Sequence, residues 1–92
     1  MIVQSLPVNG LIKFYADWCA PCKTISPSVK NAANDAGIDL LEVDIDVNPE
    51  IADRFGVNAL PTVIVMREGK AVEMSVGAHG KQHYVDLANK AK

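Results

Sequence analysis

Two cysteines separated by two residues are the feature of this sequence with the clearest chemistry. Cys19 and Cys22 are the only cysteines in the chain, and they follow an apolar run at residues 11–16 where helical periodicity begins. This spacing puts both sulfurs within bonding reach and the first one at a helix start. Backbone N–H groups and the helix dipole favour negative charge there, so Cys19 is the predicted attacking thiolate in thiol–disulfide exchange. Cys19 is expected to be exposed, whereas Cys22, one turn further in, is predicted to be more buried and to resolve the mixed disulfide.

A zinc site is the alternative use of the two thiols. Structural zinc needs four nitrogen or sulfur ligands, and only His79 and His83 could complete such a set. Their spacing is typical of ligands, but they lie far along the chain from Cys22. We therefore predict no metal, and we expect both histidines at the surface near the start of the last helix, with His79 placed to touch a partner.

Size and composition are those of a single globular domain spanning residues 1–92. The chain is 49% hydrophobic and 22% charged, with a net charge of -2 and no basic patch that would bind nucleic acid. Its apolar stretches are far shorter than the roughly 20 residues that span a bilayer, so no membrane contact is expected. The N-terminus lacks the charged start and apolar core of a secretory signal, which predicts a cytoplasmic protein.

Periodicity and turn residues predict the element order β-β-α-β-α-β-β-α. Asp17 is expected to cap the first helix, and Pro27 should kink that helix or restart it from Ser26. Helices after the second and third strands imply parallel crossovers, and a hairpin at residues 67–70 adds an antiparallel edge. The predicted fold class is α/β, a mixed sheet flanked by helices. The expected strands cover residues 1–5, 11–16, 39–46, 62–66 and 71–76.

From about residue 11 to the C-terminus, the chain resembles the thioredoxin family. The resemblance implies a thioredoxin-like fold and a protein-disulfide oxidoreductase that reduces protein disulfides through a reversible Cys19–Cys22 dithiol. It also implies no further cofactor, disulfide-containing protein substrates, a thioredoxin reductase-type electron donor and a monomer. The matching residues are Phe14, Trp18-Cys19-x-Pro21-Cys22-Lys23, Pro27, Asp44-x-Asp46-x-Asn48-Pro49, Phe55-Gly56-Val57, Leu60-Pro61-Thr62 and Val76-Gly77-Ala78.

The same resemblance implies a substrate groove. Pro61 would be a cis-proline whose loop faces the dithiol, and Gly77 and Ala78 would line the groove. A cis X-Pro bond turns the chain sharply, which would leave the backbone of Leu60 free to pair with an extended substrate segment.

The residues around the sulfurs also have expected roles. Trp18 should pack beside the site as an apolar platform, and Pro21 should stiffen the turn between the two sulfurs. Ala20 stands where thioredoxins commonly have glycine, and Tyr15 where they often have tryptophan. The chain before residue 11 is also too short for the family's usual first helix.

Lys13 and Glu42 are the main departure from the family pattern. The family's buried acid behind the dithiol falls at Lys13, and the lysine that usually partners it falls at Glu42. Since the two residues lie on strands expected to be neighbours, we hypothesise a buried or half-buried ion pair near Cys22 that takes over the role of the acid. The alternative is that Lys13 extends past the shortened N-terminal region to solvent.

Two other functions stay open at this point. A glutaredoxin-like reductant fed by glutathione would share the redox chemistry. However, glutaredoxins usually have Cys-Pro-Tyr-Cys at this site, and Gly77-Ala78 is not followed by their typical Gly-Asp. A non-catalytic binding subunit of a larger assembly, with incidental cysteines, is the alternative from another class.

Overall fold

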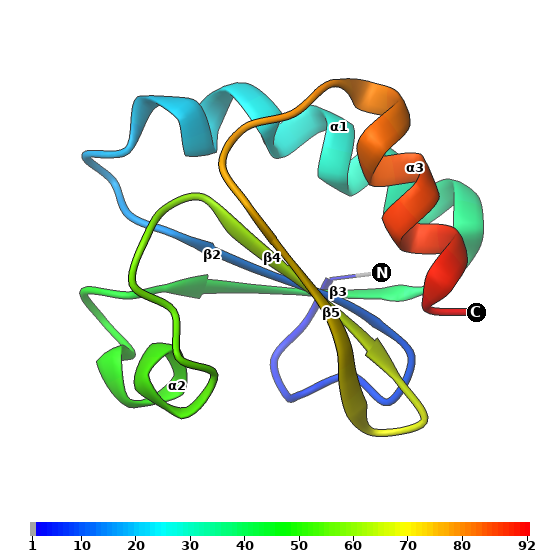
Figure 1. Cartoon of the computed structure of the whole chain (residues 1–92), viewed down its shortest axis with the longest axis horizontal. Helices are drawn as coiled ribbons and strands as arrows, with labels where there is room; N and C mark the ends of the chain where they lie inside the picture. The colour runs from blue at the N-terminus through cyan, green and yellow to red at the C-terminus, as the bar shows by residue number, and fades with distance from the viewer. Residues whose placement is uncertain (1) are drawn as a thin grey trace.

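The computed structural model describes residues 2–92 and has the predicted order of elements (Figure 1). Met1, the first residue of the predicted opening strand, lies outside the described residues. None of the helices in the described part is both long and apolar enough to cross a membrane. The elements are β1 (Ile2–Val3), β2 (Gly10–Tyr15), α1 (Ala20–Ala36), β3 (Asp39–Asp44), α2 (Pro49–Arg54), β4 (Thr62–Arg67), β5 (Lys70–Val76) and α3 (Lys81–Lys90).

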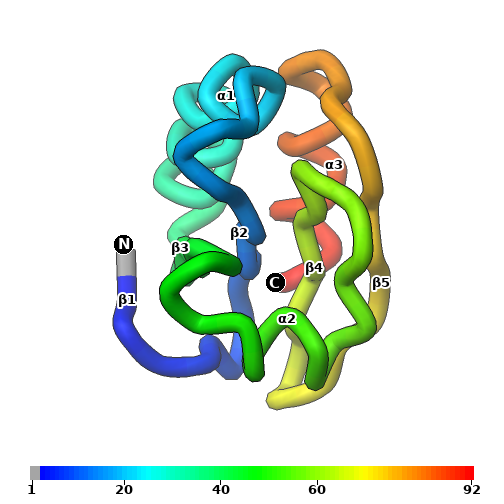
Figure 2. Tube along the Cα trace, turned by 90° about the vertical axis from the view of Figure 1, so that its left-hand side faces the viewer, coloured from blue at the N-terminus to red at the C-terminus, as the bar shows by residue number. Residues whose placement is uncertain are grey.

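The five strands form one mixed sheet in the order β1-β3-β2-β4-β5, which Figure 2 shows from edge to edge. β2 is parallel to β3 and antiparallel to β4, and the β4–β5 hairpin forms the antiparallel edge. The predicted parallel crossover through α1 is confirmed, but the one through α2 is wrong. β4 starts where β2 ends, because Thr62 pairs with Phe14. The connection through the short helix α2 therefore returns to the same end of the sheet. The ends of β2 and β3 and the start of β4 therefore lie together at one end of the sheet.

Two layers of helices cover the sheet, with α1 and α3 on one face and α2 on the other (Figure 1). Successive residues of β2 alternate between these layers, as side chains of a strand must. Leu11 packs against α1 and α3, whereas Ile12 and Phe14 pack in the cluster that contains Ala52 of α2. The nearly continuous apolar run of β2 is explained by this burial on both faces.

Helix α1 begins differently from the prediction, because its N-cap is Cys19 instead of Asp17. The predicted restart at Ser26 is also wrong, since one helix runs through Pro27. Ile25 and Val29, on either side of the proline, are buried against the sheet and α3, which holds this turn in place. Gly37 ends the helix with a φ of 69°, a left-handed conformation that glycine adopts without strain.

Gly10 lies at a close approach of two strands. It starts β2 opposite Asp39 of β3, and a Cβ atom on Gly10 would collide with the backbone carbonyl oxygen of Asp39 and lie 2.9 Å from the Cβ of Pro7. Since backbone cannot move aside cheaply, we expect Gly10→Ala to lower the free energy of unfolding by about 1–3 kcal/mol in urea denaturation. Gly80→Ala is the control, because a Cβ there meets no atom of residues 2–92 within 4 Å. Equal losses in the two variants would contradict the steric explanation.

Candidate active site

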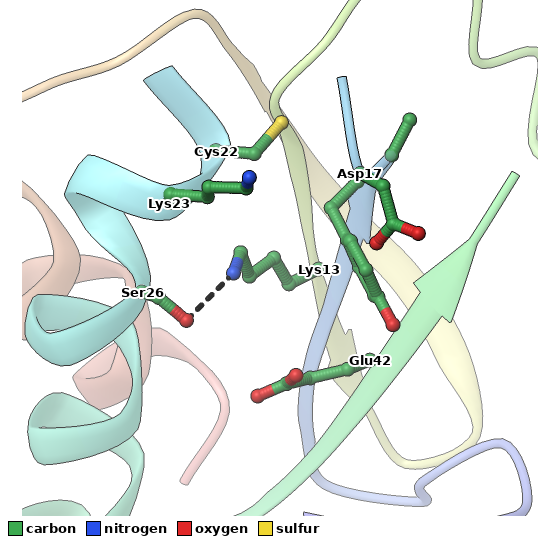
Figure 3. Close-up of a pocket in the computed structure, with 8 residues that line it drawn as sticks. Lys13, Asp17, Cys22, Lys23, Ser26 and Glu42 are labelled. Carbon is green, nitrogen blue, oxygen red and sulfur yellow. Dashed lines mark hydrogen bonds between the residues drawn. The ribbon is translucent and has the colours of Figure 1, made fainter. Parts of the chain in front are cut away.

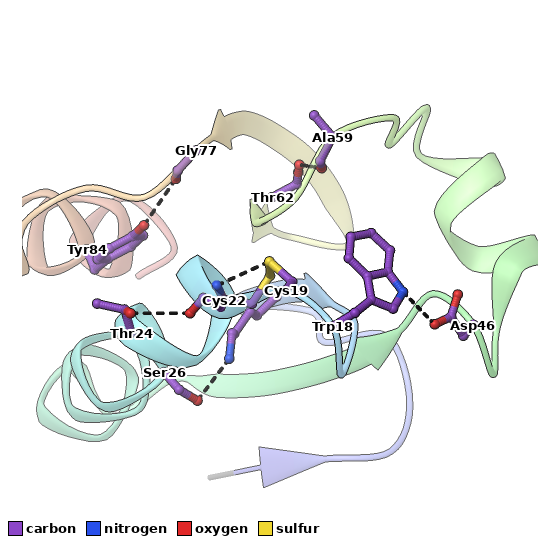
Figure 4. The surroundings of a disulfide bond; sticks show 12 residues. Trp18, Cys19, Cys22, Thr24, Ser26, Asp46, Ala59, Thr62, Gly77 and Tyr84 are labelled. Atoms are coloured by element: carbon purple, nitrogen blue, oxygen red, sulfur yellow. Dashed lines mark hydrogen bonds between the residues drawn. A yellow bond between two sulfur atoms is a disulfide. The ribbon is translucent and has the colours of Figure 1, made fainter.

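Cys19 and Cys22 form a disulfide at the N-terminus of α1 (Figure 4). Their Cα atoms are 5.3 Å apart. Cys19 is the N-cap residue, and its Sγ accepts a hydrogen bond from the backbone N–H of Cys22 at 3.2 Å. The sulfur thus satisfies one of the N–H groups that the first turn of a helix leaves unpaired. The predicted placement of the first cysteine at a helix start is confirmed.

The two sulfurs differ in accessibility, although less than expected. Cys22 is 1% exposed and Cys19 is 5% exposed, so Cys22 is the more buried of the two, as predicted. The expectation of an openly exposed Cys19 is wrong, because Cys19 packs in a small apolar cluster with Ala16 and the half-buried Leu60. Only a small part of the surface of Cys19 is therefore accessible to a reaction partner. Ala20 and Pro21 are both exposed, in the first turn of α1.

The loop before β4 lies next to the disulfide cluster, at the same end of the sheet. The Leu60–Pro61 peptide bond is cis, as expected, and Leu60 contacts the cluster. The N–H of Gly77 donates to the carbonyl oxygen of Pro61 at 2.9 Å, which joins the end of β5 to this loop. Gly77 has a φ of 89°, so a side chain there would be strained, and Ala78 follows in the exposed part of the same segment. The structure thus brings together Leu60, Pro61 and Gly77 as predicted.

Trp18 is held by a residue that the sequence did not single out as functional. Trp18 is 69% exposed, and its Nε1 donates a hydrogen bond to Oδ2 of Asp46 at 3.0 Å. Trp18 is therefore a mostly solvent-facing ring fixed at one end, instead of a packed platform (Figure 4). Trp18 and Asp46 are 28 positions apart in the chain, so no local sequence pattern would reveal the contact.

Lys13 and Glu42 lie side by side in the sheet, but the predicted ion pair between them is wrong. They are register partners on β2 and β3. The ammonium of Lys13 donates to Oγ of Ser26 at 2.9 Å, whereas Oε1 of Glu42 lies 3.8 Å from Nζ of Lys30. Each residue thus interacts with α1, because Ser26 and Lys30 are one helical turn apart above the two strands. The alternative, in which Lys13 reaches solvent, is also wrong, since Lys13 is 3% exposed.

A cavity of about 220 Å³ lies beside Lys13 and Cys22 (Figure 3), and we call it the Lys13 cavity. Burial lowers the pKa of the Lys13 ammonium, while the nearby Glu42 carboxylate acts in the opposite direction. Burial also raises the pKa of the Tyr15 hydroxyl, with a smaller contribution from Asp44. The residues that line the cavity are Lys13, Tyr15, Ala16, Asp17, Cys22, Lys23, Ser26 and Glu42.

The two histidines gather at a different place. The rings of His79 and His83 stack with their centroids 4.1 Å apart, and Nε2 of His83 lies 2.7 Å from Oγ of Ser75. Within residues 2–92, no three His, Cys, Asp or Glu side chains are grouped so that they could hold a metal ion. The hydroxyl of Tyr84 accepts from the N–H of His79 and donates to the carbonyl oxygen of Gly77 at 3.4 Å, which ties the histidine pair to the segment beside Pro61.

The anchoring of Trp18 can be tested by fluorescence, because it is the only tryptophan in the chain. We expect Asp46→Ala to release the indole, which should lower the steady-state fluorescence anisotropy while changing the free energy of unfolding by less than about 1 kcal/mol. Asp46→Asn retains a carbonyl oxygen at the same place and should keep the anisotropy of the wild type. A fully mobile ring in both variants would show that charge, and not the hydrogen bond alone, holds the indole.

His83 should make stability depend on pH. Burial, followed by the neighbouring His79, lowers the pKa of His83 below its ordinary 6.5, and Glu73 and Asp86 oppose this shift. The unfolded chain then binds the proton more tightly, so this contribution to stability is complete above about pH 6.5 and is lost as the pH falls through the lowered pKa of the folded state. We expect the difference in unfolding free energy between wild type and His83→Gln to shrink on acidification in urea titrations. A constant difference between about pH 5 and 8 would contradict this.

Comparison with known proteins agrees with the geometry. The thioredoxin family model matches residues 2–90. A thioredoxin of Chlamydia muridarum is 41% identical over 81 residues, covering 87% of this chain and 79% of the relative, and a thioredoxin of Bacillus subtilis is 38% identical over 82 residues with the same coverage. Among solved structures, a mutant thioredoxin from Halobacterium salinarum superposes with a TM-score of 0.88 at 29% identity, covering 99% of this chain and 88% of that chain. The reduced Schistosoma mansoni thioredoxin pre-protein gives a TM-score of 0.81 at 33% identity, covering 92% and 82%. This chain belongs to the thioredoxin family and is a thiol–disulfide oxidoreductase.

Proposed function

We propose that this chain reduces disulfide bonds of other proteins, with Cys19 as the attacking thiolate and Cys22 as the resolving thiol. The observation that carries the proposal is the position of Cys19 as the N-cap of α1, with its Sγ already accepting the backbone N–H of Cys22. When the disulfide is reduced, the same N–H group and the positive end of the helix dipole stabilise a negative charge on Cys19. Cys19 also retains more accessible surface than Cys22.

The reaction then proceeds in two exchange steps. The thiolate of Cys19 attacks one sulfur of the substrate disulfide, a Cys19–substrate disulfide forms, and the other substrate sulfur leaves as a thiolate that takes a proton from water. Cys22 gives its thiol proton to water and attacks Sγ of Cys19, which forms the Cys19–Cys22 bond and releases the second substrate sulfur as a thiolate that takes up a proton. The substrate gains two electrons and two protons, and the protein dithiol becomes a disulfide.

The surroundings of Cys19 support a protein segment as the substrate. Leu60 offers a half-buried apolar contact next to the disulfide, and the Pro61–Gly77 hydrogen bond fixes two backbone segments beside it. We assign Leu60, Gly77 and Ala78 to the groove for an extended substrate segment, with the exposed ring of Trp18 at its rim.

The protein must be reduced again after each turnover. We propose a reductase of the thioredoxin reductase type as the electron donor, with glutathione as the second candidate. The protein is expected to act as a monomer, and its cytoplasmic location stays a prediction. The site needs no cofactor for these steps, since the electron pairs move between sulfur atoms.

Insulin reduction with dithiothreitol as the electron source tests the proposal. We expect turbidity from released insulin chains with the wild type and a loss of activity of at least 100-fold with Cys19→Ser, because the nucleophile is absent. Cys22→Ser should instead accumulate a mixed disulfide at Cys19, visible on a non-reducing gel and by mass spectrometry. Equal activity of wild type and Cys19→Ser, or no activity in either, would favour the non-catalytic binding subunit.

The same assay separates the two electron donors. Replacing dithiothreitol by a thioredoxin reductase with NADPH should support turnover, while glutathione with glutathione reductase should support much slower turnover. The opposite order would favour the glutaredoxin-like alternative.

A further inference from the structure

A buried lysine behind a buried cysteine is the most unusual feature of this site. Lys13 is 3% exposed and Cys22 is 1% exposed, and both line the Lys13 cavity. In Figure 3 the side chain of Lys13 extends into the cavity between Cys22 and Glu42. A cation is expensive to bury unless it has compensating partners, so this position calls for an explanation.

The structure provides the ammonium of Lys13 with incomplete compensation. An ammonium has three N–H donors. Within residues 2–92, Lys13 makes one hydrogen bond, to Oγ of Ser26, and its Nζ lies 5.3 Å from the centre of the Tyr15 ring. Glu42 does not complete the set, because its Oε1 is 3.8 Å from Lys30 and has no hydrogen-bond partner among the described residues. The ammonium of Lys13 therefore has N–H donors without a hydrogen-bond partner among the described residues.

The other charged side chains that line the cavity are more exposed than Lys13. Asp17 and Lys23 line the same cavity but are exposed to solvent, and Glu42 is half-buried with the cation of Lys30 close by. Tyr15 is uncharged at neutral pH, since its pKa is raised above the ordinary value of 10.0. Charges in contact with water interact weakly, so Asp17 and Lys23 have little effect, and Lys13 is the buried cation that shares this cavity with Cys22.

We propose that Lys13 is a positioning residue for the resolving step, whose ammonium stabilises the thiolate of Cys22 across the Lys13 cavity. In the disulfide form Cys22 carries no charge. The resolving thiolate places a negative charge on Cys22, on the cavity that it shares with Lys13. In this step the proton of the Cys22 thiol passes to water, the thiolate attacks Sγ of Cys19 in the mixed disulfide, the Cys19–Cys22 bond forms, and the substrate sulfur leaves as a thiolate. This inference rests on the proposed function.

Reaction of the reduced protein with dithiobis(nitrobenzoate), a chromogenic aromatic disulfide, measures this step directly. The first release of coloured thiolate should depend on reagent concentration and reports attack by Cys19. The second release should be independent of reagent concentration and reports attack by Cys22. For Lys13→Met, we expect the midpoint of the pH–rate profile of the second phase to move up by about one pH unit, which makes this phase roughly tenfold slower below the midpoint.

Two variants keep the test specific. Lys13→Arg retains the positive charge and should restore the midpoint, although not necessarily the stability. Lys30→Met removes a lysine that also faces Glu42 but does not line the cavity, and it should leave the midpoint unchanged. Lys13→Gln replaces Lys13→Met if the latter does not fold.

The outcomes separate the two proposals. A wild type without a second phase would contradict the proposed function and this inference with it. A second phase whose midpoint is the same in wild type and Lys13→Met would overturn the role of Lys13 alone, even if the free energy of unfolding changed. An upward shift that Lys13→Arg does not reverse would also overturn it, since charge would then not be the cause.

Discussion

The burial of β2 on both faces is the constraint on which the rest of this structure depends. Its residues alternate between the α1–α3 layer and the α2 layer, and Leu11, Ile12 and Phe14 have no exposed surface. A strand held from both sides cannot slip in register without moving its apolar side chains out of the core. The position of its last residues is therefore fixed, and these residues lead directly into the turn that carries Cys19.

The active site lies at one end of the sheet because three connections between strands and helices meet there. β2 ends there and leads into α1, and β3 ends beside β2. β4 begins at the same end of the sheet, after the loop that contains Pro61. Gly77 comes from β5, the neighbour of β4, and its hydrogen bond to Pro61 closes the arrangement. Residues separated by up to about sixty positions in the chain thereby surround two sulfur atoms.

The burial of β2 on both faces also explains why the charge of Lys13 is buried near the disulfide. Position 13 points toward α1 because positions 11 and 13 share a face, so any side chain there is enclosed by the helix. A lysine in this position loses most of its hydration, and Ser26, the Tyr15 ring and the nearby Glu42 offset only part of that loss. The fold can tolerate this cost because its apolar core is continuous elsewhere on the same face.

Patterns within a few residues were enough to predict much of this protein. The spacing of Cys19 and Cys22 led to the disulfide and to the helix start, and the periodicity of apolar residues led to the order of all eight elements. The resemblance to thioredoxins supplied the cis Leu60–Pro61 bond and the approach of Gly77 to it. Contacts between distant segments could not be predicted in this way. Four features depend on how the helices and loops are aligned with the strands. They are the direction of β4, the hydrogen bond from Trp18 to Asp46, the limited exposure of Cys19 and the separate partners of Lys13 and Glu42. That alignment results from packing the whole core, and local spacing carries no information about it.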